Sequence, residues 1–421
     1  MADDETSMSL NGDPLALCLS LSSNKKHRLM VRRNLSMSIS EWASLPEALI
    51  FLILDNLLEP IDHVRFAAVC KEWCYLSKVY NLATQRWLKV LPMLLIPSQL
   101  ESQTQVETTG PTTRAVYSIN EGKVYENVRL PVPYSKICRG SSHGWLATID
   151  LADQPINITL VNPFTKETIR LPPLEFEAQD MNLWFHPYEN FVQKVILSTD
   201  PSLNRDNYMV VAIYRGVCRL AFTKAGEKYW RSIHINVTDA VFYKNKIYAV
   251  GYRLGSIFSV DVEKSHAYRR QPFIQIAPFI EIGQADWEYL VESIKGDLLQ
   301  VRMFAIKDGR TKGSWTESFC VYKVVFDDSN RTIRKVEVKD IGDEALFLGV
   351  NHSFSVLASN FVGCKPNCIY HTCKLNPTGM NIFNLEDKSI TRIQVPSPNC
   401  DPTSRIPPAI WIFPTFNGLG H

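Results

Sequence analysis

The most regular hydrophobic pattern of the chain lies near its front, from residue 44 onward. Ser44, Pro46 and Glu47 form a helix start signal, with a serine N-cap, a proline in the first turn and a glutamate three residues after the cap. Apolar residues then recur at helical spacing on two adjacent rows: Leu49, Ile53 and Leu57, and Ile50, Leu54 and Leu58. Two such rows predict a helix that needs cover on two sides. The Glu59-Pro60 pair predicts its end, because the residue before a proline is pushed out of the helical region.

Two shorter helices are predicted to follow. Their inward residues are Val64, Ala67 and Ala68 in the first, and Val69, Cys70, Trp73 and Leu76 in the second. Three short helices in about fifty residues are close to the smallest unit that supports its own core. Surplus apolar surface on such a unit indicates that a partner completes it.

From about residue 114 the pattern changes to short strands rich in Val, Ile, Tyr and Phe, separated by turn residues. The strongest apolar strands are expected at Trp145–Ile149, Lys194–Leu197, Met209–Ile213, Lys246–Val250, Tyr289–Glu292, Leu298–Arg302 and Phe354–Ala358. A loose repeat of about 40–50 residues is typical of the four-stranded blade of a β-propeller, and the length of the region predicts about six blades. A β-sandwich, which would bury similar strands, stays open as an alternative.

These patterns predict an α+β multidomain chain. We expect a disordered arm at residues 1–38, a helical domain at 39–90, a linker at 91–113 and an all-β domain at 114–421. Within the linker, the apolar, proline-bounded segment Leu91–Pro97 is expected to pack on the next domain as an extended segment.

Composition and charge limit the partners and the cellular location that are expected. The net charge of +2 gives no strong attraction to nucleic acid or to a membrane surface, so neither is expected as a partner. The acidic start of the chain and the scattered 10 cysteines favour an intracellular protein with reduced thiols, in the nucleus, the cytoplasm or both. In the arm, the basic cluster Lys25–Arg33 is open to two interpretations, a nuclear import signal or a solvated charge run.

The helical segment also resembles a known family. The residues that carry the resemblance are Leu45-Pro46, the Leu49/Ile53 row, Arg65 and the Val69–Trp73 run, which together read as an F-box. The resemblance implies docking to the Skp-type adaptor of a cullin-based ubiquitin ligase, through the positions Leu45, Pro46, Leu49, Ile53, Val69, Cys70 and Trp73. One departure is His63-Val64, where the family more often has two leucines. A plain helical domain with these residues as its core is the alternative.

The β-rich region resembles the KIB-type domain of plant F-box proteins. The resemblance rests on Cys138–Leu146, Asn162–Thr165 with Leu171–Pro173, Tyr289–Leu299, and Asp343–Gly363 with Asn367–Tyr370. It implies a propeller-like recognition domain after the F-box, and it does not identify the target.

Two groups of residues suggest chemistry. Ser141-Ser142-His143 suggests a nucleophile, but alternation in an extended segment places Ser142 and His143 on opposite faces, and the flanking glycines favour a turn. Cys364, Cys368, His371 and Cys373 offer zinc ligands, but their spacing is not that of paired knuckles, so we expect buried thiols and no metal. No phosphate-binding glycine motif occurs, and no cofactor is expected.

The sequence therefore predicts a non-catalytic substrate-recognition component of an SCF-type (Skp-cullin-F-box) E3 ubiquitin ligase. Its partners would be a Skp-type adaptor, through it a cullin, and a target protein. The alternative is an F-box scaffold without a role in degradation, linked to transcription through the leucine-rich run Leu15–Leu21, which resembles the LxLxL motif bound by plant co-repressors. An enzyme is a third hypothesis, with no motif behind it.

Overall fold

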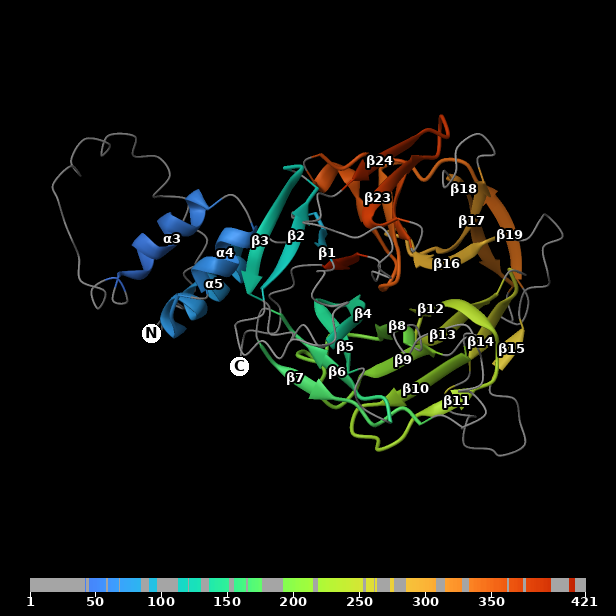
Figure 1. Ribbon diagram of the computed structural model, residues 1–421, viewed down its shortest axis with the longest axis horizontal. Helices are drawn as coiled ribbons and strands as arrows, with labels where there is room; N and C mark the ends of the chain where they lie inside the picture. The colour runs from blue at the N-terminus through green and yellow to red at the C-terminus, as the bar shows by residue number, and fades with distance from the viewer. Residues whose placement is uncertain are drawn as a thin grey trace, which may run out of the picture. The chain divides into compact units, whose positions relative to one another are not determined.

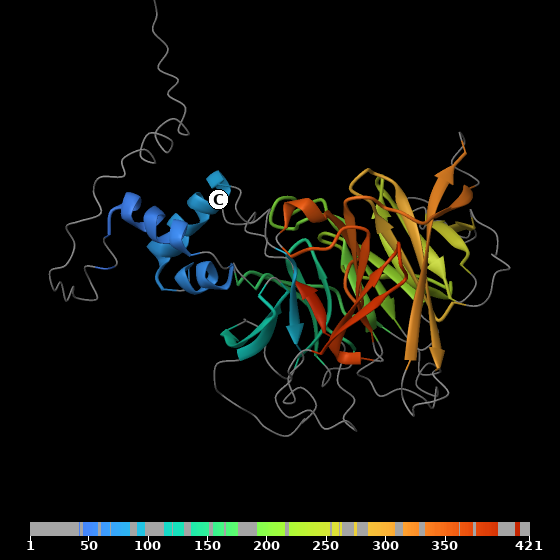
Figure 2. The ribbon, with the colours of Figure 1, turned by 90° about the horizontal axis from the view of Figure 1, so that it is seen from above.

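The computed structural model shows a ring of β-sheets and, by itself, a helical segment (Figures 1 and 2). The arm at 1–38, including the leucine-rich run and the basic cluster, lies outside the described residues, as do Ser44 and Leu58. The structure describes residues 42, 45–57, 60–67, 69–84, 91–96, 113–119, 121–129, 136–150, 155–163, 166–175, 192–214, 219–252, 255–260, 262, 273–275, 285–307, 315–327, 333–361, 363–373, 376–394 and 409–412.

The helical segment contains α3 (Glu47–Asn56), α4 (Pro60–Ala67) and α5 (Lys71–Thr84). The first turn of α3 forms around Pro46, whose carbonyl accepts hydrogen bonds from the Leu49 and Ile50 amides at 2.9 and 3.2 Å. Pro60 opens α4, where a proline loses no helical hydrogen bond. Among the described residues no helix is both long enough and apolar enough to cross a membrane.

The described strands form six sheets, arranged as blades around one axis. Blade 1 is β25 (Ile410–Ile412), β1 (Met93–Ile96), β2 (Thr113–Ser118) and β3 (Lys123–Arg129). Blade 2 is β4 (Lys136–Ser142), β5 (Trp145–Asp150), β6 (Ile158–Val161) and β7 (Thr168–Arg170). Blade 3 is β8 (Val192–Leu197), β9 (Met209–Tyr214), β10 (Arg219–Lys224) and β11 (Arg231–Ile233).

The remaining blades follow in chain order. Blade 4 is β12 (Val237–Tyr243), β13 (Lys246–Gly251), β14 (Ile257–Val260) and β15 (Phe273–Gln275). Blade 5 is β16 (Trp287–Glu292), β17 (Leu298–Lys307), β18 (Trp315–Phe326) and β19 (Ile333–Val338). Blade 6 has five strands in the order β21 (Phe354–Leu357), β20 (Glu344–Leu348), β22 (Cys368–Cys373), β23 (Asn376–Asn384) and β24 (Ile390–Gln394), with η6 (Ala358–Asn360) after β21.

The ring is closed by pairing the two ends of the β region. β25 pairs antiparallel with β1, with Leu94 opposite Trp411, so blade 1 takes its innermost strand from the end of the chain. The innermost strands β4, β8, β12 and β16 contact one another in sequence, β16 contacts β21, and β25 contacts β4. This radial closure confirms the predicted propeller and its six blades, and it excludes the β-sandwich.

The first strand of the propeller comes from residues that we expected to form a linker. We assigned residues 91–113 to a connection, with Leu91–Pro97 packed on the next domain as an extended segment. In the structure Met93–Ile96 is the strand β1, hydrogen-bonded between β25 and β2, and its four side chains are buried.

The core of the propeller lies between its blades. Six clusters of buried apolar residues in the described part each join two neighbouring blades. In β1, for example, Leu94 and Ile96 face blade 6, whereas Met93 and Leu95 face blade 2. Because both faces of a blade are covered, its inner strands are apolar at successive positions instead of alternating with polar ones.

The residues between β20 and β21 cross the centre of the ring; we call residues 349–353 the central segment. Val350 packs on the cluster between blades 1 and 2, and Asn351 Oδ1 accepts a hydrogen bond from the Trp411 amide at 3.4 Å. Ser353 Oγ lies 3.4 Å from Asp239 Oδ2 on blade 4 and 3.4 Å from Lys194 Nζ on blade 3. The segment therefore bridges blades on several sides of the axis.

Candidate functional site

The helical residues predicted to meet an adaptor differ in their exposure. Val69 and Leu49 are 61% and 47% exposed, whereas Trp73 is 9% exposed. Pro46 is exposed, and Leu45, Ile53 and Cys70 are half-buried. Trp73 stacks on Phe66 of α4, so it contributes mainly to packing inside the helical segment.

The two apolar rows predicted for α3 differ in their burial. Ile50 and Leu54 are fully buried, whereas Leu49 and the nearby Leu52 are about half exposed, at 47% and 57%. Leu52 belongs to neither predicted row, although its position three residues after Leu49 places it on the same side of the helix. The Ile50 and Leu54 row thus serves the fold, whereas in the other row Leu49 is exposed and Ile53 and Leu57 are half-buried.

Exposed apolar side chains concentrate in this part of the chain. Among the described residues, ten large hydrophobic side chains are exposed, and five of them lie between residues 42 and 75: Trp42, Leu49, Leu52, Val69 and Tyr75. Such a concentration over a short segment is typical of a surface that a partner covers.

The departure from the F-box pattern at His63 has a local explanation. His63 is 1% exposed, and its Nε2 lies 2.8 Å from the carbonyl oxygen of Leu57, just after the end of α3. A histidine near a helix C-terminus can satisfy a carbonyl that has no partner within the helix. A leucine at this position could not make that contact.

The Ser141-Ser142-His143 run forms the end of β4 and a tight turn. His143 and Gly144 both have positive φ, 50° and 79°, and they form the turn between β4 and β5. Ser142 Oγ accepts a hydrogen bond from the Leu197 amide at 3.2 Å and lies 3.3 Å from Nδ1 of His352. The imidazole beside Ser142 is therefore one from the central segment, 210 positions away.

The glycine before this turn is required by close packing of two blades. A Cβ on Gly140 would lie 2.3 Å from the carbonyl oxygen of Val195 in β8. Since no side chain fits there, Gly140 allows β4 and β8 to approach at the centre of the ring.

The central segment also joins a buried ion pair. The Lys194 ammonium pairs with the Asp239 carboxylate, and both side chains are almost fully buried. Asp239 further accepts hydrogen bonds from the Leu290 amide at 3.0 Å and the Ala240 amide at 2.7 Å. The charges are thus satisfied by the inner strands of blades 3, 4 and 5, which indicates a structural role for this network.

The cysteine and histidine positions weighed as zinc ligands face different layers. Cys368 packs in the cluster between blades 6 and 1, and burial raises the pKa of the Cys364 thiol to about 11. His371 lies on the other face of β22, with Nε2 2.9 Å from the Tyr289 hydroxyl. Cys373 lies in β22, but its side chain is outside the described part. Nowhere in the described part do three or more His, Cys, Asp or Glu side chains form a metal-binding group.

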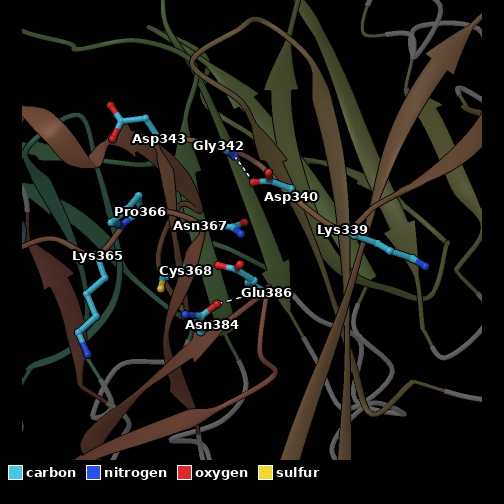
Figure 3. Close-up of a pocket in the computed structure, with 10 residues that line it drawn as sticks. All are labelled: Lys339, Asp340, Gly342, Asp343, Lys365, Pro366, Asn367, Cys368, Asn384 and Glu386. Atoms are coloured by element: carbon cyan, nitrogen blue, oxygen red, sulfur yellow. Dashed lines mark hydrogen bonds between the residues drawn. The ribbon is translucent and has the colours of Figure 1, made fainter.

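A polar cavity of about 660 Å³ lies beside blade 6 (Figure 3). The side chains of Asp340, Asn367, Asn384 and Glu386 converge there, whereas Lys339 points away. Three of the oxygens accept from turn amides: Asp340 from Gly342, Asn384 from Glu386, and Asn367 from Ile341, at 2.7–3.1 Å. These side chains therefore hold the loops of blade 6 in shape.

The family of the β region is decided by its match to a family model. The model described as "KIB1-4 beta-propeller" matches residues 116–392, which is most of the ring. The chain belongs to this family.

Two relatives from Arabidopsis thaliana resemble it over nearly their whole lengths. The putative F-box protein At4g22180 is 24% identical and covers 90% of this chain and 95% of its own, and the putative F-box protein At3g25750 is 25% identical with 86% and 97% covered.

Likeness to solved structures is much weaker. TolB from Acinetobacter baumannii covers 80% of this chain and 72% of its own at 7% identity, with a TM-score of 0.37. Neither the family model nor the F-box proteins that resemble this KIB1-4 propeller chain indicate an enzymatic family.

Proposed function

We propose that this chain is the substrate-recognition component of an SCF-type E3 ubiquitin ligase. In this role the segment 39–90 is an F-box that binds a Skp-type adaptor and, through it, a cullin. The propeller binds a target protein. The observation that carries the proposal is that α3 buries Ile50 and Leu54 and exposes the apolar side chains of Leu49 and Leu52. The names of the relatives, which are F-box proteins, support it.

The adaptor contacts are assigned to the predicted positions that solvent reaches: Leu45, Pro46, Leu49, Ile53, Val69 and Cys70. Leu52 joins them because it is exposed on the same side of α3 as Leu49. Trp73 has an indirect role, because its packing on Phe66 holds α4 and α5 together.

The chain itself performs no chemistry in this proposal. Ubiquitin transfer is accelerated by proximity, because the complex holds lysines of the target near a ubiquitin-charged enzyme. Residues 1–38 serve as an arm, and residues 91–113 lead from the F-box into the β domain at 114–421 and contribute β1 to it. The role requires an intracellular location, in the nucleus, the cytoplasm or both.

The test compares proximity labelling by the wild type and by the Leu45→Ala/Pro46→Ala variant, each with and without a proteasome inhibitor. A degradation role predicts a labelled protein whose abundance rises on inhibition with the wild type alone. A partner that both forms label, and whose abundance never changes, would overturn the proposal and favour the non-degradative scaffold.

A further inference from the structure

A second cavity, with a volume of about 560 Å³, lies on one face of the propeller, next to the central segment. We call it the mouth cavity. Its walls come from four places far apart in the chain: the β4–β5 turn, the β16–β17 turn, β21 with η6, and β25. Its size is within the range of cavities that bind small molecules, roughly 300–1,000 Å³.

Most of the lining is apolar. Phe354 and Val356 of β21, Phe361 after η6, and Trp411 of β25 contribute to the walls, and Ile294 lies at the rim. Ile294 is 54% exposed, so the cavity has an accessible apolar edge. Phe354 is held in place by stacking on Phe347, with ring centroids 5.1 Å apart.

The polar groups in the lining carry no charge at neutral pH. None of the lining residues described is an aspartate, glutamate, lysine or arginine. Solvent reaches His143, but partial desolvation lowers its pKa against the opposing effect of Asp200. Burial, with the nearby His143 and Lys194, lowers the pKa of His352 to about 3. Both imidazoles are therefore neutral, and a charged ligand would lose its hydration here without gaining a counter-charge.

His352 supplies the polar contact that orients a ligand. Its Nδ1 lies 3.3 Å from Ser142 Oγ, and its backbone amide donates to the Ser141 carbonyl at 3.1 Å. Because Ser142 engages Nδ1, Nε2 is the ring nitrogen that remains for a ligand. A neutral imidazole nitrogen pairs with a hydroxyl or carbonyl group according to its tautomer.

We propose that the mouth cavity binds an uncharged, mainly apolar small molecule that carries one hydroxyl or carbonyl group. The apolar body lies against Phe354, Phe361 and Trp411, and the polar group meets His352. This inference is independent of adaptor docking. A bound molecule would form part of the surface that this end of the propeller presents to a target.

The probes are three compounds with one ring system: naphthalenemethanol, which is neutral, naphthoate, an anion, and naphthylmethylamine, a cation. Binding to the purified full-length chain is measured by saturation-transfer NMR titration. The neutral alcohol is expected to bind saturably. The two ions are expected to bind about tenfold or more weakly, because a buried unpaired charge loses its solvation.

Two variants test the location. Leu357→Trp fills the cavity, and Ile294→Asp places a charge at its exposed rim; both should reduce binding of the alcohol by about tenfold or more. Val336→Asp is the matched control, because Val336 is an exposed residue on β19 of the same blade as Ile294 and should leave binding unchanged.

Three results would overturn the inference. They are no saturable binding of the alcohol, equal binding of all three probes, or equal loss with Val336→Asp. None of these results bears on adaptor binding, so the proposed function and this inference can fail separately.

Discussion

The indole of Trp73 stacks on the phenyl ring of Phe66, with ring centroids 4.3 Å apart and planes inclined by 20°. Phe66 is on α4 and Trp73 is in the first turn of α5, so this contact joins the two helices. Both side chains are almost fully buried, at 5% and 9% exposure. Trp73 therefore holds the fold of the segment, whereas Val69, four residues before it, faces solvent.

Replacing Trp73 with alanine should unfold the helical segment. Removal of a buried aromatic side chain typically costs about 3–5 kcal/mol. Hydrogen exchange measured by mass spectrometry on the full chain should show lost protection over α4 and α5. Tyr75→Ala is the matched control, because Tyr75 is in the same helix and 59% exposed. Equal loss of protection in both variants would contradict a core role for Trp73.

Blade 5 contains a fully buried ion pair that should be sensitive to the loss of one partner. Glu288 accepts hydrogen bonds from Arg302 Nε at 3.0 Å and from Gln300 Nε2 at 2.7 Å, and the side chains of Glu288 and Arg302 have no exposure. Arg302→Met removes the hydrogen-bonded cation of the buried Glu288, which then has only the charge of Lys335 nearby, and should cost about 3–5 kcal/mol in urea unfolding.

A second substitution separates this effect from lost packing. Adding Glu288→Leu to Arg302→Met removes the unpaired carboxylate, so the double variant should be more stable than the single one. The exposed pair of Arg205 and Glu167 is the control, and Arg205→Met should cost about 1 kcal/mol or less. A double variant less stable than Arg302→Met would show that the carboxylate is not the source of the cost.

His352 should make the propeller less stable in mild acid. Its pKa is about 3 in the folded chain, below the ordinary value of about 6.5 expected when unfolded. Between these values the unfolded chain binds a proton that the folded chain does not, so stability falls as pH falls from about 6.5 toward 3. His352→Gln removes this contribution, which amounts to about 2 kcal/mol between pH 7 and pH 5.

The measurement is the urea midpoint at both pH values for the wild type, His352→Gln and His234→Gln. His234 is exposed and serves as the control. The wild type and the control should lose more stability on acidification than the His352 variant. An NMR titration in which the His352 ring changes its shift near pH 6.5 would contradict the lowered pKa.

The propeller could be predicted from local patterns because each blade is made of neighbouring strands. The apolar segments predicted at Trp145–Ile149 and Met209–Ile213, for example, lie within β5 and β9. Hairpin pairing depends on residues close in the chain, and the repeat of turns at short intervals reveals it. The number of blades follows from the number of repeats.

Contacts between residues far apart in the sequence could not be predicted from local patterns. The pairing of Leu94 with Trp411, which closes the ring, joins positions at opposite ends of the β region. The approach of His352 to Ser142 depends on the central segment crossing the axis, and no periodicity in the sequence signals it. The prediction for α3 was limited in a similar way. The spacing identified its apolar residues, but it did not show which of the two rows the fold buries.

The central claim is that the exposed apolar residues of the helical segment bind a Skp-type adaptor. Its most direct test is the Kd of the purified adaptor for the full chain, for the Leu45→Ala/Pro46→Ala variant and for Leu203→Ala, an exposed control on a propeller turn. We predict binding by the wild type and the control, and a loss of about 2 kcal/mol or more, roughly thirtyfold in Kd, for the double variant. An adaptor that binds all three chains equally, or none of them, would contradict the account.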